Sequence, residues 1–173
     1  AKKREPICMD YKASTGKDYA ICGMPPPSSG MVAVGQILGT LAHTQAVKIR
    51  LEADGLPGPE WLHLYTEASR LAFADRAQYL GDPDFVPAPD GKMGGNWGTL
   101  LAPAYLAERA QRITASSMKG DAKPGAPAGI KTAFGQAADQ PEYGTSHISI
   151  VDGYGNALSM TTTIEAAFGA RQM

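Results

Sequence analysis

The sequence predicts an α+β protein, because it contains both kinds of periodicity in separate stretches. Apolar residues recur at helical spacing in three segments, 30–44, 59–79 and 103–113. Strand-like runs lie towards both ends of the chain, before residue 24 and after residue 144. Helices and strands are therefore both expected in this chain.

The first 24 residues resemble two short strands around a polar turn at 10–17, which predicts a hairpin. The only two cysteines, Cys8 and Cys22, lie on either side of this turn. The two can form a disulfide or remain free thiols, and their spacing in the sequence does not distinguish these alternatives. Neither has a His or Cys neighbour at zinc spacing, so we expect no metal site.

The three helices have recognisable starts and stops. Three consecutive prolines exclude helix at 25–27, after which Ser28 or Ser29 can cap a helix that ends near residue 43 or 44. Pro59 suits the first position of the second helix. This helix is expected to run to about residue 79, because Gly81 follows as a stop signal. The third helix is expected from 103 to 113.

Residues 119–144 are rich in Gly, Ala, Pro and Gln and contain few large apolar side chains. Such a stretch buries too little surface to hold a fixed shape, so a flexible linker is expected. We accordingly divide the chain into 1–118, the linker 119–144, and a terminal β-hairpin within 145–173.

The terminal hairpin has a predictable register. If it closes symmetrically about Tyr154, Thr145 lies opposite Thr163, and the two-residue period separates the side chains into two faces. The apolar face holds Ile148, Ile150, Leu158, Met160 and Ile164. The hydroxyl-rich face holds Thr145, His147, Ser149, Ser159, Thr161 and Thr163.

The bond between Gly144 and Thr145 lies where the predicted linker meets the predicted strand. The Thr145 hydroxyl can attack this bond, and Gly144 has no side chain to obstruct the approach. Cleavage frees the α-amine of Thr145, whose ordinary pKa of about 7.7–8.0 suits a general base at neutral pH. One residue can then be both nucleophile and base.

Three motifs resemble the γ-glutamyltransferase (γ-glutamyltranspeptidase) family in order and spacing: Met24 to Gly30, Ala74 to Asp84, and Thr145 to Asn156. The resemblance implies an N-terminal-nucleophile fold of four layers (αββα), of which this chain is a partial domain. It implies a precursor that cleaves itself between Gly144 and Thr145 into a large and a small subunit. Thr145 is then the nucleophile and Thr163 the threonine that assists it.

The resemblance also implies hydrolysis or transfer of γ-glutamyl amides such as glutathione, through an acyl-threonine intermediate. We expect Ser146 and His147 to orient the nucleophile. Glu165 is the expected substrate contact, but many members carry Asn at this position. A carboxylate there repels a substrate carboxylate, which keeps open a related acylase of the β-lactam side-chain type.

Two further alternatives stay open on the sequence alone. The chain can be a catalytically silent scaffold, since the family's oxyanion donors and a substrate-binding arginine lie outside it. Arg76 can pair with Asp75, Asp82 or Asp84, or these carboxylates can form an oxygen cluster for a cation; we expect the ion pair, because the spacing fits no EF-hand.

Composition excludes other classes of function. Sixteen basic and seventeen acidic side chains give a formal net charge of −1, and no stretch gathers five or more like charges, so neither nucleic acid nor an anionic membrane surface is an expected partner. The expected partners are a small acyl-amide substrate and the rest of the same precursor. No cofactor is required. The resemblance suggests a periplasmic or secreted protein, although no signal peptide is visible at Ala1.

Overall fold

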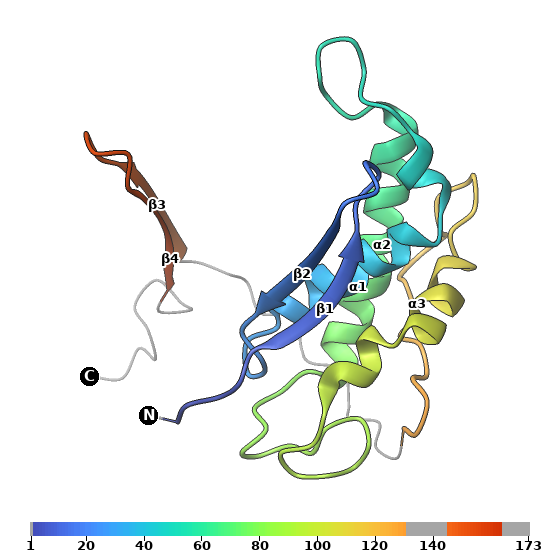
Figure 1. Ribbon diagram of the computed structural model, residues 1–173. Coiled ribbons are helices and arrows are strands. Elements are labelled where there is room, and N and C mark those ends of the chain that lie inside the picture. Colours follow the sequence, from blue (N-terminus) through green and yellow to red (C-terminus); the bar gives the residue numbers. More distant parts are fainter. Residues whose placement is uncertain (1, 131–144, 164–173) are drawn as a thin grey trace. The chain divides into compact units, whose positions relative to one another are not determined.

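The computed structural model describes residues 2–130 and 145–163 (Figure 1). The chain divides into two compact units, Ala1–Gln136 and Ala137–Met173. Among the described residues, no helix has the length and apolar character needed to cross a membrane.

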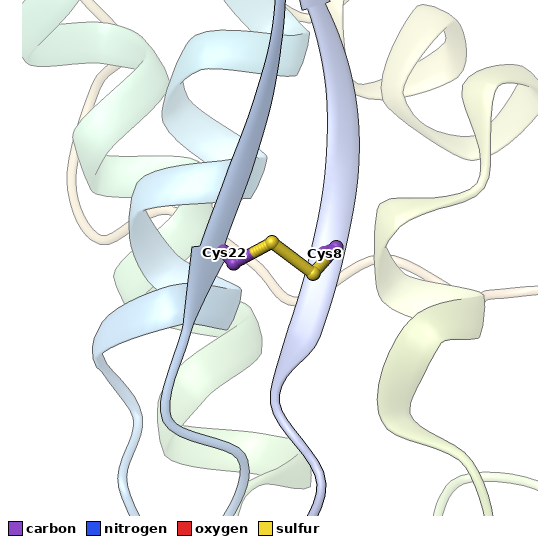
Figure 2. The surroundings of a disulfide bond; sticks show 2 residues. All are labelled: Cys8 and Cys22. Atoms are coloured by element: carbon purple, nitrogen blue, oxygen red, sulfur yellow. A yellow bond between two sulfur atoms is a disulfide. The ribbon is translucent and has the colours of Figure 1, made fainter.

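The first unit begins with an antiparallel hairpin of β1 (Ile7–Lys12) and β2 (Asp18–Gly23), as predicted. Cys8 and Cys22 lie directly opposite each other in the ladder, with their Cα atoms 4.1 Å apart. The two form a disulfide (Figure 2), which decides between the alternatives left open by the sequence.

Three helices follow: α1 (Gly30–Ala42), α2 (Pro59–Tyr79) and α3 (Pro103–Ala110). Short 3₁₀ turns, η1 (Gln45–Lys48) and η2 (Trp97–Leu101), lie between them. Helix α1 is central and contacts the hairpin, η1, η2 and both other helices. The third helix ends three residues earlier than predicted, because the chain tightens there into turns in which Arg112 and Ile113 donate to carbonyls three residues back.

Two apolar clusters form the core of this unit. One centres on Trp97, whose indole Nε1 donates to the Tyr79 carbonyl at 2.9 Å, and it packs η2 against α1 and α2. The other joins α1 to α2. The buried members are Val32, Tyr79, Ala88, Trp97, Leu100 and Tyr105 in the first cluster, and Ile37, Leu41, Ala46, Ala68 and Ala72 in the second.

The polar residues of the Ala74 to Asp84 motif are structural, but the partner expected for Arg76 was wrong. Asp75 pairs with Arg109 at 3.1 Å, and Asp84 pairs with Arg4 at the same distance. The Nε of Arg76 instead donates to the Ser29 hydroxyl at 2.9 Å. Ser29 is the N-cap residue of α1, but its side chain makes no capping bond to the helix.

The segment expected to be a flexible linker differs from that expectation over its described part. Residues 118–125 bond to side chains of α2 and α3, Pro127 is fully buried, and Ile130 packs on the Trp97 cluster. The low apolar content of the segment did not indicate these contacts, because the segment is held by polar side chains of the helices that bond to its main chain. Residues 131–144 lie outside the described part, so the linker stays a prediction there.

The second unit contains a hairpin of β3 (Thr145–Val151) and β4 (Ala157–Thr163). The strands pair antiparallel with Thr145 opposite Thr163 and Val151 opposite Ala157. The register predicted from symmetry about Tyr154 is confirmed at every pair of the ladder.

Candidate active site

The turn between β3 and β4 fixes the register of the candidate site. The carboxylate of Asp152 accepts from the backbone N–H groups of Tyr154 and Asn156, both at 2.9 Å, and from the side-chain amide of Asn156 at 2.8 Å. Gly155 has φ of 86°, a left-handed conformation that glycine adopts without strain. Hydrogen bonding, first from the Asn156 amide, holds the pKa of Asp152 below its ordinary value.

The two threonines predicted to carry the chemistry meet at the open end of the hairpin. The Thr145 Oγ1 donates a hydrogen bond to the Thr163 Oγ1 at 3.0 Å. Cross-strand neighbours on one face have adjacent Cβ atoms, so the register itself produces this contact. The bond orients the hydroxyl of Thr145, the first residue of β3.

His147 forms the next rung of this face, and hydroxyls hold both of its ring nitrogens. Its Nδ1 is 2.8 Å from the Thr161 hydroxyl, and its Nε2 is 3.0 Å from Ser149 Oγ and 3.2 Å from Ser159 Oγ. Hydroxyls both donate and accept, so this environment accommodates either tautomer of the imidazole. The arrangement fixes the orientation of the ring.

Ser149 and Ser159 were expected on this face but not as functional residues. The alternation of side chains along each strand predicted the face on which the two serines lie. That both contact the same nitrogen of His147 follows only from the pairing of the strands, which puts the two serines opposite each other. The face is therefore a ladder of three polar rungs, Thr145 with Thr163, His147 with Thr161, and Ser149 with Ser159.

The structure does not bring every predicted residue to this ladder. Ser146 pairs with Thr162 and so belongs to the opposite face, with Ile148 and Met160. Its predicted orienting role has no direct geometric support. Gly144 and Glu165 lie outside the described residues. Within residues 2–130 and 145–163, no three His, Cys, Asp or Glu side chains are grouped so as to hold a metal ion.

Comparison with known proteins first identifies the class of fold. A crystal structure of Helicobacter pylori gamma-glutamyltranspeptidase matches 72% of this chain and 32% of its own, with a TM-score of 0.54 and 31% identity. A gamma-glutamyltranspeptidase from Pseudomonas nitroreducens matches with the same TM-score at 29% identity. The chain is thus α+β and forms part of an N-terminal-nucleophile hydrolase fold, which confirms the predicted class.

The chain belongs to the gamma-glutamyltranspeptidase family, since the family model matches residues 1–173. It is 34% identical to the glutathione hydrolase proenzyme of Escherichia coli strain K12, over 98% of this chain. It is 35% identical to the acylase ACY 1 proenzyme of Pseudomonas sp. strain V22, over 96% of this chain. The chain spans about a quarter of the length of these curated relatives, 25% of each.

Proposed function

We propose that this chain carries the self-cleavage junction and the nucleophile of an enzyme that hydrolyses or transfers γ-glutamyl amides such as glutathione. The observation that carries the proposal is the hydrogen bond of Thr145 to Thr163, at the start of the strand that the family resemblance assigns to the nucleophile. Relatives named glutathione hydrolase proenzyme, from Escherichia coli and Bacillus subtilis, support both the substrate class and a precursor form.

Self-cleavage begins with attack of the Thr145 hydroxyl oxygen on the carbonyl carbon of Gly144. The peptide C–N bond breaks as the C–O ester bond forms, and the proton lost by the hydroxyl ends on the released nitrogen. Water then hydrolyses the ester, which leaves a carboxylate on Gly144 and a free α-amine and hydroxyl on Thr145. The acceptor hydroxyl of Thr163 orients the attacking group before the cut and after it.

Turnover repeats the same attack on a substrate. The α-amine takes the hydroxyl proton while the oxygen attacks the γ-glutamyl carbonyl, and the amine of the substrate leaves with a proton. Water or an acceptor amine then cleaves the acyl-threonine ester. His147, held by three hydroxyls, orients this face and is not required as the base.

Mass spectrometry of the full-length protein tests the first step. Two pieces that separate between Gly144 and Thr145 are the expected result, followed by release of glutamate from glutathione or from a chromogenic γ-glutamyl anilide. A chain that remains intact and inactive under all conditions would instead support the silent scaffold.

The acylase of the same family is a second candidate, because the acylase ACY 1 proenzyme, at 35% identity, falls within the range of 34% to 38% of the glutathione hydrolases. Glu165 favours this alternative on charge, since its carboxylate repels the α-carboxylate of a γ-glutamyl group. Parallel assays with a γ-glutamyl anilide and with a butyryl anilide, whose acyl group lacks both the α-amino and the α-carboxyl group, separate the two. Glu165→Asn should raise the first activity relative to the second if Glu165 sets specificity.

A further inference from the structure

The main chain of residues 118–125 is held by side chains like a bound peptide, although the segment has no regular secondary structure. At its start, the N–H of Met118 donates to Glu67 Oε2 at 2.9 Å, and the carbonyl of Met118 accepts from Arg70 Nη1 at 2.9 Å. Arg70 also donates to the Gly120 carbonyl. One ion pair of α2 thus holds three main-chain groups.

A second ion pair holds the far end of the segment. The N–H of Gly125 donates to Asp75 Oδ1 at 2.8 Å, and Arg109 Nη2 donates to the Lys123 carbonyl at 2.9 Å. The Tyr79 hydroxyl donates to the Gly125 carbonyl at 2.5 Å. The start of residues 118–125 is therefore fixed to α2, and the end to both α2 and α3.

Three of the four charged groups that make these bonds are buried in the core, and the fourth, Arg70, keeps 30% of its side chain exposed. Glu67, Asp75 and Arg109 are exposed by 2%, 0% and 5%. The other oxygen of Asp75 accepts from Gln36 at 2.8 Å and Tyr105 at 2.7 Å. Burial, and then the Asp75 carboxylate, raise the pKa of the Tyr105 phenol, which therefore stays a hydrogen-bond donor.

Stability alone does not explain buried ion pairs, because apolar residues of similar volume often stabilise a core as well or better. Both pairs also bond to the main chain of residues 118–125, in addition to the bonds of Asp75 to Gln36 and Tyr105 and of Arg109 to the Leu71 carbonyl. Gly125 fits the same explanation: a Cβ there would overlap Tyr105 Oη and lie 2.9 Å from Arg109 Cδ. Only glycine at this position lets the segment lie this close to Tyr105 and Arg109.

We propose that α2 and α3 form a binding groove for extended main chain, the 118–125 clamp, which fixes the start of the tether leading to the Gly144–Thr145 bond. This inference rests on the self-cleavage proposed above. With the clamp closed and with Pro127 and Ile130 packed, the first unit fixes the chain as far as Ile130, 14 residues before Gly144, whereas the end of α3 at Ala110 is 34 residues before Gly144. The entropic cost of bringing two points of a chain together is smaller when fewer residues separate them. The clamp therefore favours presentation of the scissile bond.

Gly125→Ala tests the clamp from the side of the bound segment, without replacing any residue of the two ion pairs. Hydrogen exchange of the Met118 and Gly125 amides, measured by NMR, should be slow in the unaltered protein and faster by roughly ten- to hundredfold in Gly125→Ala, as loss of bonds to charged groups predicts. Gly30→Ala is the matched control, because its Cβ meets only Ser28 Oγ at 3.7 Å. Fast exchange of both amides in the unaltered protein overturns the clamp.

Self-cleavage of the full-length protein tests the tether. Gly125→Ala should slow the appearance of the two pieces by roughly two- to fourfold, because release of the clamp lengthens the stretch that must be ordered from about 14 towards about 34 residues, and it should leave turnover per processed site unchanged. Lost amide protection with an unchanged cleavage rate overturns the tether while self-cleavage stands. An unaltered protein that never cleaves overturns both the tether and the proposed function, while slow amide exchange still establishes the groove.

Discussion

The two units of this chain use polar side chains in opposite ways. In the first unit, Glu67, Asp75 and Arg109 are buried, and each bonds to the main chain of 118–125. In the second unit, Thr145 and His147 lie on an exposed strand face and bond mainly to other hydroxyls. Buried charge marks architecture here, and the exposed hydroxyl ladder marks the candidate chemistry.

This difference shows that burial of a charged side chain does not by itself indicate a catalytic role in this chain. A buried carboxylate such as Asp75 resembles a catalytic group by burial alone, but its partners are Gln36, Tyr105, Arg109 and a backbone amide, all of them structural. Thr145 has no unusual burial; the register of the strand and the proposed cleavage of the bond before it make it the candidate nucleophile. Substitutions in the first unit should therefore lower stability, whereas substitutions on the hydroxyl-rich face of the second unit should lower self-cleavage and turnover.

The largest expected effect is at Thr145. Thr145→Ala should abolish both self-cleavage and turnover, because alanine has no hydroxyl to attack Gly144 or a substrate amide. Thr145→Ser should retain part of both, since it keeps the oxygen and, after cleavage, the α-amine, but loses the methyl group that restricts the rotamer. Mass spectrometry and a γ-glutamyl assay measure the two steps. Cleavage between residues 144 and 145 in Thr145→Ala would remove Thr145 from the mechanism.

The next largest effect is on stability, at Asp75. Asp75→Ala leaves Arg109 buried without its partner and should cost about 3–5 kcal/mol of unfolding free energy. Both tryptophans, Trp61 and Trp97, lie in the first unit, so their fluorescence in a urea titration reports that unit. Asp121→Ala is the control within the clamped segment; its exposed side chain predicts a change within about 0.5 kcal/mol. Equal costs for the two variants would contradict the structural role of Asp75.

Sequence reasoning predicted the second unit more completely than the clamp. The period of two and one turn centre were enough to pair Thr145 with Thr163, because a hairpin has few registers. In α2 the apolar pattern predicted the helix and its bounds, but not the burial of Glu67 and Asp75. Asp75 does fall on the stripe of Ala68, Leu71, Ala72 and Tyr79, a polar residue at a core position. Its partners come from segments far away in sequence, which local patterns do not contain.

A smaller effect is expected at His147, where the question is whether the ring acts as a base. His147→Ala should lower turnover by roughly tenfold or more through misalignment of the ladder. His147→Asn should recover part of this, because its amide can replace Nδ1 as the partner of Thr161. The pH–rate profile of the processed enzyme decides the role: a limb in the α-amine range that persists in both variants leaves the base with Thr145, and one that disappears transfers it to His147.

The smallest effect is expected at the hairpin turn. Asp152→Ala removes the acceptor of three hydrogen bonds, two from backbone amides and one from Asn156, and should loosen the register. Cross-strand NMR contacts between Ser149 and Ser159 measure this pairing. Asp152→Asn is the matched control, because it keeps an oxygen acceptor and removes the charge.

The pH dependence of the turn separates charge from shape. Because the Asn156 amide and then backbone amides lower the pKa of Asp152, its carboxylate stabilises the hairpin fully above the ordinary value of 3.8. That contribution is lost as the pH falls below 3.8 and through the lower pKa of the folded state. The NMR titration midpoint of the Asp152 carboxyl should therefore lie below 3.8, and the Ser149–Ser159 contacts should weaken with it, whereas in Asp152→Asn they should not change over this range. A midpoint at or above 3.8 would show that the turn does not favour the charged form, and the register would then depend on the strands alone.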